Sequence, residues 1–336
     1  MNKIKLIFLC FPFFGYAQVT TIPDSNFELA LVNLGLDNMV DGFVLNSRID
    51  TLTSLIVPAC NIQSLVGIAA FQSLTYLDCS SNNMDTLSLT NNYLSYLDCS
   101  DNQLIEIDIS SHLNLQTFKC SYNEFIEIDV SQNTSLLYFE CTKNKLTALD
   151  ISNNIFLTEL WCNDNNLSDL DVAGIDMYVL VCDNNQLTTI DNLSDNISLK
   201  HLSCSGNDIA SLLLLAHPQL NWLSCSENQL FQLDISNQLN LNYLFTWGNS
   251  SLNCINVVDV SLANATWSVW NGQSGNIDGH HYFSASCILS STFQVKDNKR
   301  LSSILNLKGQ QSRIIKNKPL FYKYNDGIVE QKIILE

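Results

Sequence analysis

The sequence has few charged residues and is especially short of basic ones. Charged residues make up 15% of its 336 residues, and 16 Lys and Arg stand against 33 Asp and Glu, for a formal net charge of −17. Because nucleic-acid binding depends on basic side chains at the phosphates, this deficit excludes a nucleic-acid partner. Hydrophobic residues make up 46%, enough for a substantial core, so a disordered chain is excluded as well.

Common enzyme signatures are also missing. The sequence contains no His-Glu-x-x-His, Gly-x-Ser-x-Gly, Gly-rich phosphate loop or Cys-x-x-Cys pair. His280 and His281 follow Asp278 and offer metal ligands, but we interpret them as part of a solvated loop, so neither a metal nor a cofactor is expected. No stretch approaches the roughly 20 apolar residues of a transmembrane helix.

The first 17 residues have the pattern of a secretory signal peptide. Two lysines precede an apolar run at residues 6–14, and a small-x-small sequence at residues 15–17 predicts cleavage before Gln18. The expected location is therefore secreted or at the cell surface.

Cysteine recurs with a nearly constant period through the middle of the chain. The intervals are 20, 21, 21, 21, 20, 22 and 21 residues. A period this regular predicts a solenoid, because a unit this short buries its apolar face only by stacking on its neighbours. We call residues at the same position in successive repeats a column, and the cysteine column is Cys79, Cys99, Cys120, Cys141, Cys162, Cys182, Cys204 and Cys225.

Two polar columns share this period. Asparagine lies three residues after each cysteine, where its carboxamide is expected to bind backbone groups of the turn and stacked copies are expected to bind one another. Aspartate lies nine residues after most cysteines, and we interpret it as a turn cap, with calcium bridging as the alternative. The aspartate column is Asp108, Asp129, Asp150, Asp171, Asp191 and Asp234.

The full pattern of one repeat resembles a known family. Residues 136–152 read Leu-x-x-Leu-x-Cys-x-x-Asn-x-Leu-x-x-Leu-Asp-Ile-Ser, apart from Phe139, and this resembles the leucine-rich repeat family. It is most similar to the bacterial internalin-like class, in which cysteine replaces an interior leucine. The resemblance implies a solenoid of the α/β horseshoe class, mostly parallel β with few helices, with about ten repeats of 20–22 residues.

The ladder cysteines are predicted to be free, buried thiols. In-register neighbours in a parallel sheet keep their Cβ atoms about 4.8 Å apart, beyond the roughly 3.5–4.5 Å of a disulfide. The column then acts as a row of small hydrophobic side chains, with a redox or metal ladder as the alternative.

Strand residues three before, one before and one after each cysteine are expected to point away from the core. Aromatic and acidic residues dominate the first two of these columns and supply rigid contact area, so we interpret this face as binding a protein or glycan ligand. The alternative is that the rings only stack along the ladder and stiffen it. The candidate site residues are Tyr76, Asp78, Tyr96, Asp98, Tyr138, Glu140, Trp161, His201, Trp222, Tyr243 and Phe245.

Caps are expected at both ends of the repeats. A short helix after Pro23, reaching to Gly35, opens a segment similar to the N-terminal part of secreted leucine-rich repeat proteins of the Bacteroidetes type. Residues 254–287 depart from the period and resemble the C-terminal cap of that group. Cys254 and Cys287 lie outside the ladder in this segment, and we predict that they form a disulfide.

Residues 288–336 differ in composition from the rest. They hold nine Lys and Arg against four Asp and Glu, a net charge of +5, whereas residues 18–287 have a net charge of −24. Strand-like runs at 304–310, 320–324 and 329–335 predict a small antiparallel β unit. It resembles the C-terminal sorting domain of the type IX secretion system, which implies the secretion machinery as a partner; an ordinary β appendage is the alternative.

The predicted organisation is a signal peptide (1–17), an N-terminal cap (18–50), leucine-rich repeats (51–253), a C-terminal cap (254–287) and a sorting domain (288–336). The interpretation that we favour is a non-catalytic recognition or adhesion protein. The alternative is an extracellular hydrolase that uses carboxylates on the exposed face, although an open, wet surface does not separate their pKa values.

Overall fold

The computed structural model describes residues 18–90, 93–272 and 274–287, and the backbone of three strands between residues 301 and 333. The chain divides into two compact units, Met1–Cys287 and Ile288–Glu336. The predicted signal peptide lies outside the described residues.

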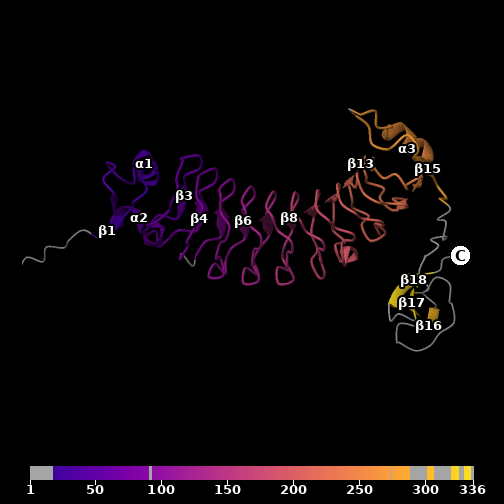
Figure 1. The fold of residues 1–336 in the computed structure, drawn as a ribbon, viewed down its shortest axis with the longest axis horizontal. Coiled ribbons are helices and arrows are strands. Elements are labelled where there is room, and N and C mark those ends of the chain that lie inside the picture. The colour runs from indigo at the N-terminus through magenta and orange to yellow at the C-terminus, as the bar shows by residue number, and fades with distance from the viewer. Residues whose placement is uncertain are drawn as a thin grey trace, which may run out of the picture. The chain divides into compact units, whose positions relative to one another are not determined.

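The first unit is a solenoid built on a ten-stranded parallel sheet (Figure 1). Each strand pairs in register with the next repeat, so that Leu97 lies between Leu77 and Phe118. This confirms the predicted fold class. The strands are β3 (Ser54–Ile56), β4 (Tyr76–Asp78), β5 (Tyr96–Asp98), β6 (Thr117–Lys119), β7 (Tyr138–Glu140), β8 (Glu159–Trp161), β9 (Val179–Val181), β10 (His201–Ser203), β11 (Trp222–Ser224) and β13 (Tyr243–Phe245).

The ladder cysteines lie one residue after these strands and point into the core. All eight are fully buried and are free thiols. Burial raises their pKa values, to about 12 for Cys162 and Cys225. The column therefore contributes small apolar groups in their neutral form.

The asparagine column joins consecutive turns. The Asn144 Nδ2 atom donates to the carbonyl oxygens of Cys120 and Cys141, both at 3.1 Å, and its Oδ1 atom accepts from the Phe125 amide at 3.1 Å. The expectation that stacked asparagines bind one another is wrong for this column. Backbone groups of two turns already occupy both ends of the carboxamide.

A second row of buried polar side chains was not predicted. The Asn133 Nδ2 atom donates to the carbonyl oxygens of Ile109 and His112, both at 3.0 Å. The next repeat copies this arrangement, because Asn154 Nδ2 donates to the carbonyl oxygens of Val130 and Asn133. The sequence signal is an asparagine or histidine three before the first leucine of most repeats.

An N-terminal cap covers the first repeat. Helix α1 (Ser25–Asn33) confirms the predicted helix. The Asp24 carboxylate accepts from the backbone amides of the first turn and, through Oδ2, from those of Gln63 and Ser64, which ties the helix to the repeats. The remaining cap elements are β1 (Val19–Thr21), β2 (Phe43–Leu45) and α2 (Asn46–Ile49). Two 3₁₀ turns lie within the repeats, η1 (Ile68–Ala70) and η2 (Leu193–Asp195).

A separate three-stranded parallel sheet closes the other end. It contains β12 (Leu233–Asp234), β14 (Cys254–Asn256) and β15 (Tyr282–Ser284), with helix α3 (Val260–Thr266) between the last two. A disulfide joins Cys254 to Cys287, whose Cα atoms are 5.8 Å apart.

The interpretation of His281 as part of a solvated loop is wrong. Its side chain is buried against the last repeat, with Nε2 3.2 Å from the Asn249 carbonyl oxygen and Nδ1 accepting from the Asp278 amide at 3.2 Å. A carbonyl only accepts and an amide only donates, so these partners fix a neutral ring with its proton on Nε2. The ligand atoms of Asp278, His280 and His281 lie within 4.8 Å of one another, but both ring nitrogens of His281 are already engaged.

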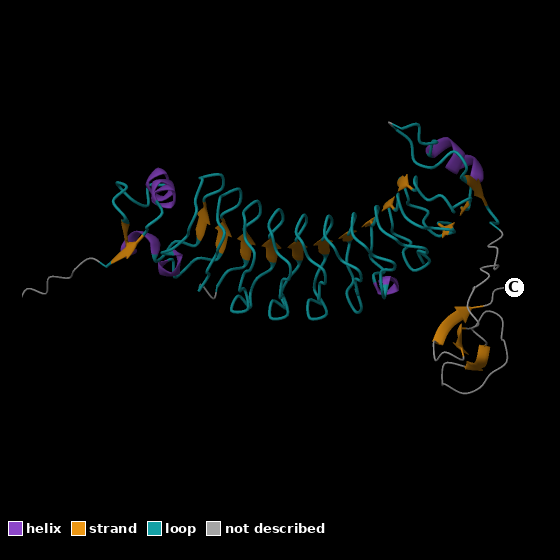
Figure 2. Cartoon of the chain, viewed as in Figure 1, coloured by secondary structure: helices purple, strands orange, loops and turns teal. Residues whose placement is uncertain are grey.

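The second unit contains an antiparallel sheet in the order β16 (Leu301–Leu305), β17 (Pro319–Tyr324) and β18 (Val329–Ile333). This confirms antiparallel strands in the C-terminal segment. The first strand begins earlier than the predicted 304–310, and residues 306–310 lie outside the described part. The helices, drawn in purple in Figure 2, are short, and none in the described ranges is long and apolar enough to cross a membrane.

Candidate ligand-binding face

The candidate site residues lie on the outward side of the ten-stranded sheet, which we call the strand face. Strands β4 to β8 each bury only their middle residue and turn its two neighbours toward solvent. This follows from the two-residue period of a strand, because the middle leucine or phenylalanine is needed by the core. The strand face therefore presents two outward side chains from each of these strands.

The N-terminal part of the strand face is aromatic and acidic. The rings of Tyr76 and Tyr96 stack with centroids 4.0 Å apart and planes inclined by 6°. Asp78 is in register with Asp98 on the next strand. Burial raises the pKa of Asp98, and the nearby charge of Asp78 adds to this, whereas hydrogen bonds from Ser100 oppose it. This part of the face thus carries partly desolvated negative charge.

The middle of the face pairs aromatic side chains with carboxylates. The Tyr138 hydroxyl donates to Glu140 Oε2 at 2.9 Å, and the Trp161 indole donates to Glu159 Oε2 at 3.3 Å. The Lys119 ammonium lies 5.3 Å from the centroid of the Tyr138 ring. Each aromatic tip thus binds a carboxylate two residues away on the same strand, which restricts the rotamers of both.

The C-terminal part of the face is a run of contacting rings. His201 and Trp222 stack at 5.1 Å with planes inclined by 9°, and Trp222 also lies 4.7 Å from Tyr243 and 5.5 Å from Phe245. Trp161 extends the run to His201 at 6.2 Å. Burial lowers the pKa of His201, so its ring is neutral near pH 7.

These contacts bear on the alternative that the rings only stack. Stacking does occur, as that alternative expects, and it fixes the ring orientations along the sheet. The outermost ring is still largely accessible, because Tyr243 is 50% exposed. Stacking and availability to a ligand therefore coexist on the same face.

Asp183, one residue after the cysteine position, is a carboxylate that the prediction left out of the site. It accepts from the Ser203 hydroxyl at 2.8 Å and from the Ser205 amide at 2.6 Å. Burial raises its pKa, and these hydrogen bonds oppose the rise. The sequence signal for Asp183 was its place in the third outward column, one residue after the cysteine position.

The aspartate column lies on the opposite side of each turn. The Oδ1 atoms of Asp108, Asp129 and Asp150 accept from the backbone amide two residues ahead at 2.9, 2.8 and 2.9 Å. The turn-capping interpretation is therefore confirmed for these three. Hydrogen bonds from the following serines lower their pKa values, which keeps them ionised.

Comparison with known proteins identifies the architecture. No protein-family model and no curated protein matches the sequence. Among solved structures, the chain is similar to the functional domain of InlJ from Listeria monocytogenes, which includes a cysteine ladder, with 26% identity, a TM-score of 0.51, and coverage of 73% of this chain and 69% of that one. The fold is a leucine-rich repeat solenoid.

Two further solved structures share the solenoid fold. The leucine-rich repeat domain of APL1B matches with 18% identity and a TM-score of 0.53, over 63% of this chain and 67% of that one. A chain of the LRIM1/APL1C complex matches with 20% identity and a TM-score of 0.54, over 64% of this chain and 42% of that one. At these identities the likeness shows the fold alone.

Proposed function

We propose that this protein is a non-catalytic recognition or adhesion protein, secreted or held at the cell surface, that binds a protein or glycan through the strand face. The observation that carries the proposal is the continuous run of ring contacts from Trp161 to Phe245. Aromatic side chains held in fixed rotamers contribute large contact area with little entropy loss, as binding surfaces require.

Catalysis by the carboxylates of this face has less support. Asp78 and Asp98 each accept hydrogen bonds from a serine two residues ahead, so both are engaged as turn caps. The two grooves described below are lined by residues on the other side of each turn. A carboxylate pair on an open sheet surface lacks the enclosed environment that general acid catalysis requires.

Export completes the proposed function. The signal peptide at residues 1–17 and the basic unit at residues 288–336 support secretion, the latter as a type IX sorting domain in a protein of the Bacteroidetes type. Deletion of residues 288–336 is expected to leave the protein inside the outer membrane. Unchanged export of the truncated chain rules out the sorting role.

Arrays of glycans and extracellular proteins, run beside a broad hydrolase screen, test the binding role. A ligand is expected to be retained by the intact chain and lost when Tyr138, Trp161 and Trp222 are all changed to Ala. The matched control changes Tyr93 and Tyr282 to Ala, because both rings are exposed and lie outside the strand face. Turnover that disappears on changing one strand-face carboxylate contradicts the proposal.

A further inference from the structure

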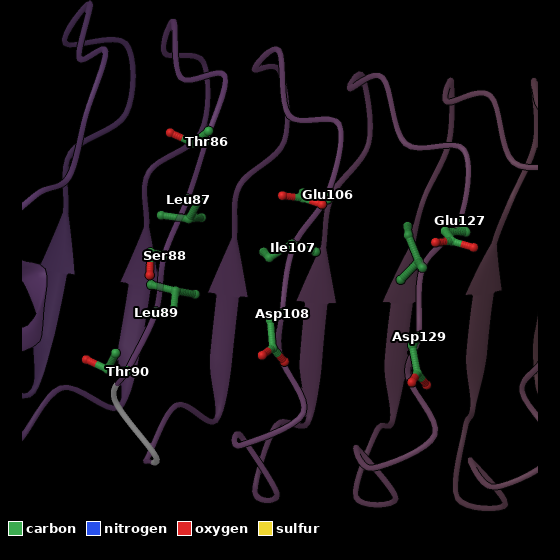
Figure 3. Close-up of a pocket in the computed structure, with 11 residues that line it drawn as sticks. Thr86, Leu87, Ser88, Leu89, Thr90, Glu106, Ile107, Asp108, Glu127 and Asp129 are labelled. Atoms are coloured by element: carbon green, nitrogen blue, oxygen red, sulfur yellow. The ribbon is translucent and has the colours of Figure 1, made fainter.

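A groove crosses three repeats on the side of each turn opposite the strand face. Its volume is about 840 Å³. It is lined by residues seven to nine after the cysteine position, together with their neighbours in the first of the three repeats (Figure 3). A second groove of about 410 Å³ is lined by the corresponding residues of the repeats that follow.

In its second and third repeats the groove has an apolar floor between two acidic rows, whereas the first repeat supplies Thr86, Leu87 and Ser88. Figure 3 shows Ile107 between Glu106 and Asp108, one residue to each side. The next repeat supplies the same triplet as Glu127, Ile128 and Asp129. Ile107 and Ile128 are half-buried, whereas the four carboxylate side chains are exposed. A ligand that lies along the solenoid axis therefore meets aliphatic surface in the middle and negative charge on both flanks.

The charge of this groove is not neutralised by the protein. No Lys or Arg is among the residues that line either groove. The second groove continues the row nine after the cysteine with Asp150 and Asp171, whereas Ala148 interrupts the other row before Asp169. Hydrogen bonds from serines hold the carboxyl groups of Asp108, Asp129 and Asp150 in the ionised form. The complementary ligand is therefore cationic on both sides of an apolar centre.

The spacing of the repeats favours a helix over an extended strand as that ligand. Successive turns of the solenoid lie about 4.8 Å apart at the sheet, and one turn of an α-helix rises 5.4 Å, so a helix offers about one apolar residue per repeat. An amphipathic helix also flanks its apolar stripe with two charged rows. A strand alternates its side chains between two faces and offers no such flanks.

We propose that this groove binds a basic amphipathic helix of a partner protein, with apolar residues at i, i+3 or i+4, and i+7 over the isoleucine floor and Lys or Arg against the two acidic rows. This surface is separate from the strand face. It gives the protein a second, independent interaction site of different chemistry, one that selects positive charge rather than aromatic contact.

Binding of designed peptides to the full chain tests the proposal. Three fluorescent peptides of about 18 residues are compared by anisotropy: a Leu/Lys amphipathic helix, a scrambled sequence of the same composition, and the same helix with Glu in place of Lys. The amphipathic Lys peptide is expected to bind at least about tenfold more tightly than the scrambled one. The Glu peptide is expected not to bind.

Variants then locate the site. Changing both Glu106 and Glu127 to Gln is expected to weaken binding of the Lys peptide at least about fivefold, with a larger loss at low salt. The control pairs Asp208→Asn with Glu227→Gln, which removes the same charge from exposed positions in later repeats. No binding of the Lys peptide overturns the proposal. Equal binding of the scrambled peptide also overturns it, and so does an equal loss of affinity in the control variant. Either of these two results would mean that binding depends on net charge alone. None of these results bears on the ligand binding proposed for Trp161 and Trp222 on the strand face.

Discussion

The hydroxyl of Tyr138 donates a hydrogen bond of 2.9 Å to Glu140, two residues further along the same strand. The same relationship joins the indole of Trp161 to Glu159 at 3.3 Å. Residues two apart on a strand share a face, so the sequence period alone brings each pair together. The strand face is thus organised within strands by these hydrogen bonds and between strands by ring contacts.

Tyr138 is expected to remain protonated at alkaline pH. Burial raises its pKa, and the hydrogen bond to Glu140 and the charge of that residue add to the rise. Tyr138 should therefore stay neutral at pH values where an ordinary tyrosine, with a pKa of about 10, has ionised. The difference in ultraviolet absorbance between the intact protein and Tyr138→Phe measures this directly. A normal titration midpoint for Tyr138 contradicts the hydrogen bond.

Loss of one asparagine of the column is expected to destabilise the solenoid strongly. Asn144→Ala leaves the buried Phe125 amide without a partner, at about 1–3 kcal/mol, and removes one of the two asparagine donors from each of two buried carbonyl oxygens, to which Asn123 and Asn165 also donate. We expect the free energy of unfolding to fall by roughly 3 kcal/mol in urea denaturation. Asn153, an exposed asparagine nine residues further along the chain, is changed to Ala as the control and should alter the free energy of unfolding by less than about 0.5 kcal/mol.

The cysteines should separate into three classes by reactivity. Among the cysteines from residue 18 to residue 287, only the half-buried Cys60 is expected to react with a thiol reagent in the native protein, because burial keeps the eight ladder thiols neutral and inaccessible. Denaturation without reductant should release those eight. Cys254 and Cys287 should react only after reduction. Ladder cysteines that are blocked in the denatured, unreduced chain contradict the free-thiol ladder.

Acid should destabilise the C-terminal cap through His281. Burial lowers the pKa of this histidine in the folded state, relative to about 6.5 when unfolded. The unfolded state therefore binds the proton first, so the stability is present above pH 6.5 and is lost as the pH falls through the folded-state pKa. We expect the difference in free energy of unfolding between the intact protein and His281→Leu to become smaller as the pH falls below 6.5. A constant difference excludes the buried neutral ring.

The sequence predicted the solenoid and its polar columns because each repeat obeys the same packing constraint. The fixed positions of leucine, cysteine and asparagine indicate which side chains face the core. The repeat length sets the register between neighbouring strands. The sequence did not predict two contacts between neighbouring turns. The second asparagine row and the burial of His281 depend on neighbouring repeats rather than on one repeat's own pattern.

The backbone conformation at the corner after each cysteine was also not predicted from the sequence. The second residue after the cysteine is left-handed throughout the ladder, with φ of 55° at Tyr122, 53° at Lys143 and 51° at Glu227. Tyr, Lys and Glu ordinarily avoid this region, whereas the same position is Asp, Asn or Gly in four other repeats, so residue type gives only a partial signal. Corner hydrogen bonds impose it, such as that from the Tyr122 amide to the Thr142 carbonyl at 2.8 Å.

The most direct test of the central claim is the dissociation constant of a ligand found on the arrays, measured for single variants. Trp222→Ala and Trp161→Ala are each expected to raise it at least about tenfold, equivalent to about 1.4 kcal/mol. Tyr93→Ala should leave it within about twofold, because that ring is exposed outside the strand face. Unchanged affinity in both tryptophan variants, with folding intact, would contradict binding through the strand face.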